Sequence, residues 1–357
     1  MAVQAPAVDM DKLMTFLGQV IGELGATVNA GLIVVGDRLG LYKAMAGAGA
    51  VTPAELAEKT GTTERYVREW LNAQAAGGYV RYDPATQRYE LPPEQAMALA
   101  DENSPAFVGG AFELATATLK AVPQIEERFR TGAGLGWHEH DHGVFTGCER
   151  FFRPGYNANL VSAWIPALDG VEEKLRVGAK IADVGCGLGA SSRLLAEAYP
   201  RSRVVGFDYH RESIELAKKK AREAGLSDRL TFEVAPAASF PGGGYDLVAV
   251  FDSLHDMGDP VGAARHVKQA LAADGTWLII EPIAGDSVEQ NLNPVGRAYY
   301  AFSSFLCVPN SLSQDVGLAL GAQAGQQRIH DVVTAAGFTR FRKVGETPFN
   351  LVYEARP

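Results

Sequence analysis

The chain has 357 residues, of which 47% are hydrophobic and 21% are charged. This composition is that of an ordinary globular protein and excludes collagen-like, coiled-coil and intrinsically disordered chains. Its 33 basic and 42 acidic side chains give a net charge of −9, which argues against nucleic acid or an anionic membrane as the main partner. The length predicts two domains, because a single hydrophobic core rarely grows beyond about 250–300 residues.

The cysteines and the apolar stretches bear on the cellular compartment. Cys148, Cys186 and Cys307 lie far apart and form no CxxC pair, so we expect no disulfide framework. We expect the protein to work in a reducing cytoplasm. The first twelve residues lack a basic segment followed by a long apolar core, so we expect no signal peptide. Apolar stretches such as residues 31–35 fall short of the roughly 20 residues that a membrane span needs, and no membrane contact is expected.

Residues 1–95 predict a mostly helical domain. Apolar side chains at helical spacing indicate an amphipathic helix over residues 13–24. A capping box with a proline at the first helical position begins a short helix over residues 52–61, and a second helix follows over residues 62–72. Alternating strands around an Asp-Pro turn occupy residues 79–91. Two helices followed by a two-stranded wing are typical of a winged-helix domain.

Residues 96–170 predict a helical linker that contributes to a substrate pocket. A polar aromatic segment interrupts it at residues 137–142, where His138, His140 and His142 alternate. A metal site there is a weak hypothesis, because closely spaced histidines in a loop are common by chance. The wall of an acceptor pocket and a solvated loop both stay open as interpretations.

Residues 171–357 alternate strand and helix patterns. Strands are predicted over residues 180–183, 203–208, 230–234, 245–251 and 276–280, with helices over residues 191–199, 211–224 and 260–272 between them. Such alternation predicts a doubly wound parallel α/β sheet. Residues 338–344 and 349–354 predict a closing hairpin-like strand pair. The aromatic stretch at residues 286–313 is either a helix that completes the core or a pocket wall.

The glycine-rich run from Asp183 to Gly189 carries the strongest functional signal. It follows a strand and opens a helix, where glycines let backbone N–H groups approach a ligand. Asp208 ends the next strand about 20 residues further on, where a carboxylate can accept two ribose hydroxyls. An acidic residue before the glycines repels a pyrophosphate but suits an ammonium group. These features favour S-adenosylmethionine (AdoMet) over NAD, and the alternative is that the glycines only form a tight turn.

With these motifs, residues 171–357 resemble class I AdoMet-dependent methyltransferases. The terminal strand pair matches the antiparallel last strand of that Rossmann-like fold. With its winged helix, the whole chain resembles bacterial small-molecule methyltransferases related to plant-type O-methyltransferases. The resemblance implies methyl transfer to a small-molecule acceptor, with AdoMet as the cofactor. It also implies a homodimer formed through the N-terminal domain, as in the plant-type enzymes.

The resemblance carries cofactor roles onto particular residues. Gly185 and Gly187 would form the loop below the methionine moiety, Asp183 would support its amino group, and Asp208 would bind the ribose. The remaining expected contacts are Tyr209 on the adenine, Phe251 and Asp252 at the end of the fourth strand, and Tyr156 as a cover. Residues 235–240 hold no carboxylate for the adenine amine, so backbone contacts are expected there.

The run from Asp252 to Pro260 resembles the L-H-D-x-x-D segment of plant-type O-methyltransferases, whose histidine is the general base. His255 would take the proton of an acceptor hydroxyl, because imidazole titrates near neutrality. Glu281 matches the family carboxylate that flanks this histidine, and Gln323 stands at the place of a second one. The alternative is that His255 caps a helix or packs structurally. Transfer from AdoMet needs no metal, and none is expected.

Two rival functions come from other features of the chain. A winged helix suggests a DNA-binding regulator, but Arg65 and Arg68 are balanced by Glu64 and Glu69, whereas a recognition helix normally carries a basic surplus. Some related folds use AdoMet for hydroxylation, decarboxylation or cyclisation. N- and C-methylation also stay open.

Overall fold

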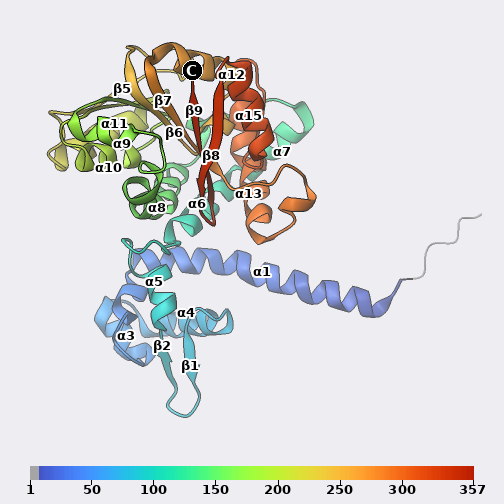
Figure 1. Ribbon diagram of the computed structural model, residues 1–357. Coiled ribbons are helices and arrows are strands. Elements are labelled where there is room, and N and C mark those ends of the chain that lie inside the picture. The colour runs from blue at the N-terminus through green and yellow to red at the C-terminus, as the bar shows by residue number, and fades with distance from the viewer. Residues whose placement is uncertain (1–7) are drawn as a thin grey trace, which may run out of the picture. The chain divides into compact units, whose positions relative to one another are not determined.

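The computed structural model describes residues 8–357 (Figure 1). The expectation that the N-terminus lacks a signal peptide rests mainly on residues 1–7, which lie outside the described residues. The chain divides into two compact units, one ending at Thr116 and the other spanning Ala117–Pro357.

The N-terminal unit confirms the predicted winged helix. Its elements are α1 (Met10–Arg38), α2 (Leu41–Met45), α3 (Pro53–Thr60), α4 (Glu64–Ala76), the antiparallel strands β1 (Arg81–Asp83) and β2 (Arg88–Glu90), and α5 (Pro93–Leu99). The capping box forms as expected, since Thr52 Oγ1 accepts from the backbone of Glu55 while the Glu55 carboxylate accepts from the backbone of Thr52. A core around Leu56 and Leu71 holds these elements together.

Helix α1 extends well beyond the predicted residues 13–24. Large apolar side chains along it are exposed, including Met14, Ile21, Leu24 and Val28. By length and composition α1 would suffice to cross a membrane, and only 17% of its apolar window is buried. The sequence expectation of short apolar stretches missed this, because Gly, Ala and Thr separate the large apolar residues of this helix.

Helices precede the sheet of the C-terminal unit. They are α6 (Gly109–Thr118, which begins in the N-terminal unit), α7 (Val122–Thr131), α8 (His142–Asn159), a π-helical turn (Leu160–Trp164) and α9 (Val171–Val177), with 3-10 turns at Leu119–Ala121 and Trp137–Glu139. Asp141 caps α8 by accepting from the backbone of Gly143.

The sheet has seven strands in the order β5-β4-β3-β6-β7-β9-β8. The strands are β3 (Lys180–Val184), β4 (Arg203–Asp208), β5 (Leu230–Val234), β6 (Tyr245–Phe251), β7 (Leu271–Pro282), β8 (Arg340–Glu346) and β9 (Asn350–Arg356). Strands β3 to β7 pair in parallel, and β9 runs antiparallel to both β7 and β8. The predicted doubly wound Rossmann-like sheet with an antiparallel last strand is therefore confirmed.

Helices cover both faces of this sheet (Figure 1). They are α10 (Ala190–Ala198), α11 (Arg211–Glu223), α12 (Pro260–Ala270), α13 (Pro294–Phe305), α14 (Cys307–Leu312) and α15 (Gly325–Ala335), with 3-10 turns η4 (Leu254–Asp256) and η5 (Glu289–Asn291). Along β6, Leu247 and Ala249 join one core while Val248 and Val250 join the other. Alternate side chains point to opposite faces of a strand, so a strand buried on both faces is apolar throughout.

The strand order places a ligand-binding crevice. The chain winds from β3 outward to β4 and β5, then returns to the other side of β3 for β6 and β7. Ligands of open α/β sheets bind at such a reversal, beyond the carboxyl ends of the strands. The glycine loop after β3 and the segment after β6 therefore meet at one edge.

Candidate active site

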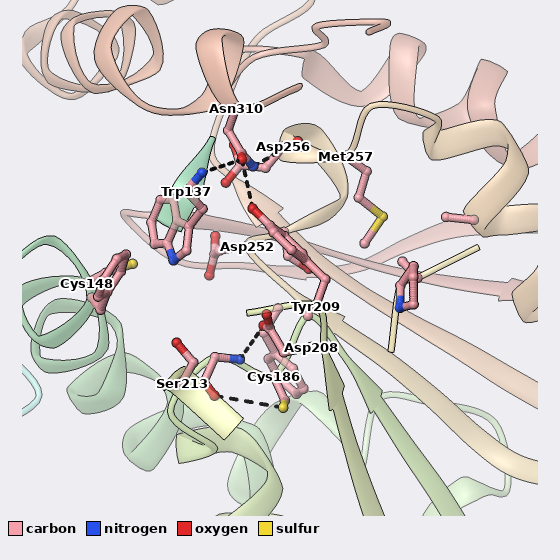
Figure 2. Close-up of a pocket in the computed structure, with 18 of the residues that line it drawn as sticks. Trp137, Cys148, Cys186, Asp208, Tyr209, Ser213, Asp252, Asp256, Met257 and Asn310 are labelled. Atoms are coloured by element: carbon pink, nitrogen blue, oxygen red, sulfur yellow. Dashed lines mark hydrogen bonds between the residues drawn. The ribbon is translucent and has the colours of Figure 1, made fainter. Parts of the chain in front are cut away.

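A cavity of about 610 Å³ opens at this edge (Figure 2). Its walls come from the glycine loop, the ends of β4 and β6, residues 235–238, one side of α8, and residues 310–315. Seven of the eight expected cofactor residues line it: Tyr156, Gly185, Gly187, Asp208, Tyr209, Phe251 and Asp252. The eighth, Asp183, does not.

The glycine loop needs glycine for two different reasons. Gly185, Gly187 and Gly189 all have positive φ angles, of 76°, 51° and 77°. A Cβ atom on Gly185 would lie 2.5 Å from Ser253 Oγ, whereas one on Gly187 would meet no atom within 4 Å. The first glycine thus allows close packing against the loop after β6, and the second leaves the floor of the cavity open.

Asp183 lies behind the loop and not in the cavity. Its side chain is fully buried and accepts hydrogen bonds from Ser191 Oγ at 2.6 Å and Ser192 Oγ at 2.5 Å. Burial raises the pKa of Asp183 to about 6, against the lowering effect of the two serine hydroxyls. The other carboxylate oxygen, Oδ1, has no partner among the described residues. In this geometry Asp183 ties the loop to the start of α10.

Asp208 joins the loop to the end of β4. Its Oδ2 accepts from the backbone N–H of Gly187 at 2.9 Å, and its Oδ1 accepts from that of His210 at 2.8 Å. Burial raises the pKa of this carboxyl group, while the two backbone donors favour the charged form. The carboxylate lines the cavity and keeps lone pairs that can accept further hydrogen bonds.

Asp252 is the first residue after β6 and has a positive φ of 49°. Its carboxylate accepts from the hydroxyl of Tyr156 and from Nδ2 of Asn350, both at 2.7 Å. Burial raises the pKa of Asp252 to about 8, against the lowering effect of the Tyr156 hydrogen bond, and the charge of Glu281 raises it further. The cavity therefore holds a carboxyl group that lacks a positive partner.

His255 lies on η4, between the carboxylates of Asp256 and Glu281. Its Nδ1 donates to Glu281 Oε2 at 2.6 Å, and its Nε2 lies 3.2 Å from Asp256 Oδ1. Glu281 also accepts from the backbone of Leu254 at 2.9 Å. Burial by itself lowers the pKa of His255, but the charges of Asp256 and Glu281 outweigh it and raise that pKa well above its ordinary value.

The expected catalytic pair is thus brought together but sits just behind the cavity wall. His255 and Glu281 are 4% and 3% exposed, and the cavity is lined instead by Asp256. Gln323, expected as a second flanking residue, donates to the carbonyl oxygen of Ile283 and lines a separate cavity. The second carboxylate that flanks His255 is therefore Asp256.

Asn310 on α14 is a site residue that sequence reasoning missed (Figure 2). Its Oδ1 accepts from the hydroxyl of Tyr209 at 2.9 Å and from the backbone N–H of Trp137 at 3.0 Å. Its Nδ2 donates to the carbonyl oxygen of Asp256 at 3.2 Å. The only available signal was the aromatic stretch at residues 286–313, which forms helices α13 and α14 and supplies a cavity wall.

The histidine segment is divided between interior and surface. His140 is buried, and neither of its ring nitrogens has a partner among the described residues. Burial lowers its pKa, more than nearby Glu139 and Asp256 raise it. His142 is exposed, 3.9 Å from Glu212, whereas Trp137 lines the cavity. The segment is therefore in part a pocket wall.

The charges of the cavity fit AdoMet. The carboxylates among its described lining residues are Glu149, Asp208, Asp252, Asp256, Asp259 and Asp315, with no lysine, arginine or histidine beside them. Glu149 is paired with Lys220 outside the cavity, and Asp256 faces the buried His255, but Asp252 has no cationic side chain beside it in the lining. A ligand that carries a sulfonium and an ammonium group would bring positive charge into this acidic cavity.

Comparison with known proteins agrees with this geometry. The Rv2258c-like winged HTH domain family matches residues 27–101, and a methyltransferase domain family matches residues 175–337. The ubiquinone/menaquinone biosynthesis C-methyltransferase UbiE of Geobacter sp. is 27% identical over 41% of this chain and 69% of its own length. The 27-O-demethylrifamycin SV methyltransferase of Amycolatopsis mediterranei is 30% identical over 36% of this chain and 50% of its own length.

Solved structures share the fold over nearly the whole chain. The mitomycin 7-O-methyltransferase MmcR superimposes with a TM-score of 0.68 at 21% identity, covering 98% of this chain and all of that one. Human N-acetylserotonin methyltransferase, in complex with AdoMet, superimposes with a TM-score of 0.69 at 16% identity and covers 99% of both chains.

The fold, the cavity and the matched domains together define a class of enzyme. The chain carries a winged HTH domain of the Rv2258c-like kind and a methyltransferase domain, and it is an AdoMet-dependent methyltransferase. AdoMet is its cofactor.

Proposed function

We propose that the chain methylates a hydroxyl group of a small-molecule acceptor, with His255 as the general base and Glu281 as its support. One observation carries this proposal. The buried Glu281–His255 pair, joined at 2.6 Å, sits directly behind the cavity wall that Asp256 forms. This is the carboxyl edge of the sheet, where the cofactor and acceptor must meet.

We assign different parts of the cofactor to different residues of the cavity. Asp208 binds the ribose hydroxyls, and Tyr209, held by Asn310, lies against the adenine. Gly185 and Gly187 let the backbone approach the methionine part, while Asp183 stabilises the loop from behind. The bound cofactor supplies an electrophilic methyl group on its sulfonium. Tyr156, Phe251 and Asp252 line the same cavity.

His255 moves the proton. The Glu281 carboxylate accepts the Nδ1–H, so Nε2 is the nitrogen that faces Asp256 and the acceptor side. Asp256 lines the cavity and orients an acceptor hydroxyl toward Nε2. Because both carboxylates raise the pKa of His255, it must lose its proton before it can accept another, and turnover should rise with pH.

The acceptor class follows from the lining. The lining carries six acidic side chains and no lysine, arginine or histidine, which disfavours an anionic acceptor by repulsion and by the cost of desolvation. The apolar part of the wall includes Trp137, Phe145, Phe152 and Met257. We therefore propose a neutral or cationic acceptor with an aromatic or apolar body, such as a phenol.

A product assay tests this function. The protein is incubated with AdoMet and matched phenols that do or do not carry a carboxylate, and the products are analysed by mass spectrometry. We expect a mass gain of one methylene on oxygen, with the neutral phenol preferred. Methylation only on carbon or nitrogen, or turnover confined to the carboxylated phenols, would contradict the proposal.

We further propose that the N-terminal unit forms a homodimer. The exposed apolar side chains of α1 include Met14, Ile21, Leu24 and Val28. A second copy of this helix would remove them from water. DNA binding is disfavoured because Arg65 pairs with Glu69 at 2.6 Å and Arg68 pairs with Glu64, which leaves α4 without a basic surplus. A gel shift at low salt tests for DNA binding.

We propose a cytoplasmic location on the basis of the three cysteines, all of them free thiols.

A further inference from the structure

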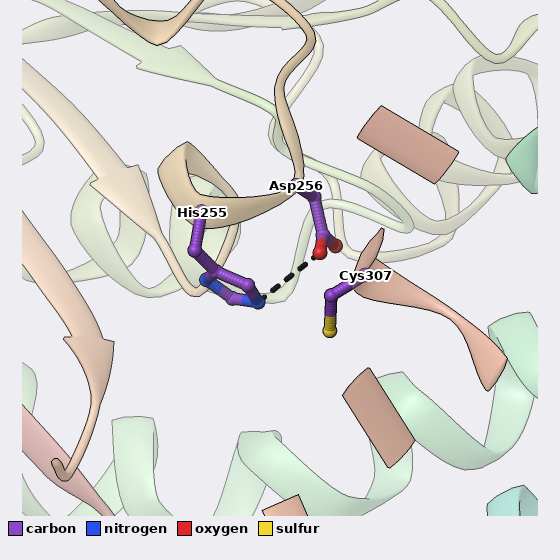
Figure 3. Close-up of side chains that lie close together, drawn as sticks. All are labelled: His255, Asp256 and Cys307. Atoms are coloured by element: carbon purple, nitrogen blue, oxygen red, sulfur yellow. Dashed lines mark ion pairs between the residues drawn. The ribbon is translucent and has the colours of Figure 1, made fainter. Parts of the chain in front are cut away.

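Three side chains from two distant segments converge beside the cavity (Figure 3). His255 and Asp256 come from η4, and Cys307 begins α14. One ring nitrogen, one carboxylate oxygen and the thiol sulfur lie within 4.8 Å of one another. We propose that these three residues bind a thiophilic divalent cation, Zn²⁺, and that the bound metal blocks the general base.

The donor set selects the metal. Thiolate, imidazole and carboxylate are the ligands that Zn²⁺ takes in proteins, whereas Mg²⁺ and Ca²⁺ prefer oxygen alone. Three protein ligands leave one position of a tetrahedral site open, and here Asp256 also lines the cavity. The sequence predicts no metal site, because nothing in the chain pattern brings residue 307 to residues 255–256.

The surroundings already orient the ligands. Glu281 Oε2 accepts from Nδ1 of His255 at 2.6 Å, which directs Nε2 toward Asp256. A carboxylate behind a metal-binding histidine is the usual arrangement in zinc sites, where it fixes the tautomer and raises the basicity of the ligand. Asp256 Oδ1 is buried and makes no hydrogen bond among the described residues, although its side chain keeps 18% exposure.

Binding exchanges protons for metal. The Cys307 thiol loses its proton to become a thiolate, and His255 loses any proton on Nε2, so uptake of Zn²⁺ releases protons and strengthens as the pH rises. The inhibitory consequence rests on the proposed function: a nitrogen bound to Zn²⁺ cannot accept the proton of an acceptor hydroxyl. Metal binding itself does not depend on that function.

Cobalt spectroscopy tests the site without turnover. Co²⁺ is added to the full-length protein, kept reduced with a phosphine and free of AdoMet. We expect a thiolate-to-cobalt charge-transfer absorption that saturates at one equivalent and is displaced by Zn²⁺. Cys307→Ala should abolish this absorption, and Cys307→Ser replaces it if the alanine variant fails to fold. An absent absorption, or one that persists without the Cys307 thiol, overturns the proposal.

Two matched controls locate the metal. Cys148→Ala removes another thiol of the same unit and should keep the absorption. The double variant His138→Ala/His142→Ala removes the exposed histidines of the loop and should also keep it. Loss of the absorption in either control would place the metal elsewhere and overturn the assignment.

Activity measurements distinguish the proposed metal site from the proposed role of His255 as the general base. Zn²⁺ should inhibit methyl transfer, a chelator should restore it, and Cys307→Ala should resist Zn²⁺ with unchanged basal turnover. If cobalt binds through Cys307 but Zn²⁺ does not inhibit, the metal site stands and the inhibitory role is overturned, along with His255 as the proton acceptor. If His255→Ala abolishes turnover but no cobalt absorption forms, the metal site is overturned and the base is supported.

Discussion

The pH midpoint of methyl transfer should shift when the negative charge of Asp256 is removed by substitution. In the wild-type protein, the carboxylates of Asp256 and Glu281 hold the pKa of His255 well above 6.5. The rate should therefore rise with pH through a midpoint above the ordinary pKa of a histidine. Asp256→Asn removes the negative charge 3.2 Å from Nε2 while keeping the shape of the side chain. The pKa of His255 should fall, so the midpoint should shift to lower pH.

The magnitude of the rate effect follows from the role of the base. A positioned general base contributes about 10²–10⁴-fold, or about 3–5 kcal/mol of transition-state stabilisation. His255→Ala should lower kcat by that factor and abolish the rising limb. The affinity for AdoMet should stay nearly unchanged, because His255 does not line the cavity.

The assay measures initial rates against pH, with saturating AdoMet and a phenol that stays neutral over the range. Asp315→Asn is the matched control, because Asp315 is an exposed carboxylate of the same cavity that makes no contact with His255. Its midpoint should equal that of the wild type. An unshifted midpoint in Asp256→Asn, or turnover close to wild type in His255→Ala, would refute the reasoning.

Three further predictions concern binding, stability and assembly. Asp208→Ala should weaken AdoMet binding by about 1–3 kcal/mol in calorimetry, because it removes a charged acceptor from the ribose; unchanged affinity would contradict this. The raised pKa of Asp252 means that the folded state holds an extra proton between pH 3.8 and about 8. Its contribution to the unfolding free energy should fall as the pH rises through this window, by up to about 1.4 kcal/mol per pH unit, and Asp252→Asn should flatten the slope in denaturant titrations. Ile21→Glu with Leu24→Glu should yield a monomer by light scattering. A monomeric wild-type protein would contradict the proposed homodimer.

The sequence by itself determined several helices and strands and the edge of the sheet at which the cavity lies. Strands β4, β5 and β6 begin and end as predicted, because each is rich in β-branched, aromatic and other apolar residues and is bounded by turn residues. The capping box at Thr52 also forms as predicted. The positive φ angles of the glycine loop require its glycines, and strand order alone brings Asp208 and Asp252 to the same edge. These features depend on neighbouring residues or on topology, both of which the sequence pattern contains.

Only the tertiary structure decided which side chains face the cavity and which meet behind it. Asp183 precedes the glycines in sequence, yet it turns inward to two serines of α10. Asn310 reaches the carbonyl oxygen of Asp256 across 54 positions of the chain, and Cys307 reaches His255 over a similar separation. No local pattern encodes such meetings, because they depend on how α14 packs over the end of β6. The raised pKa of His255 likewise depends on Asp256 and Glu281, which the fold places beside its two ring nitrogens.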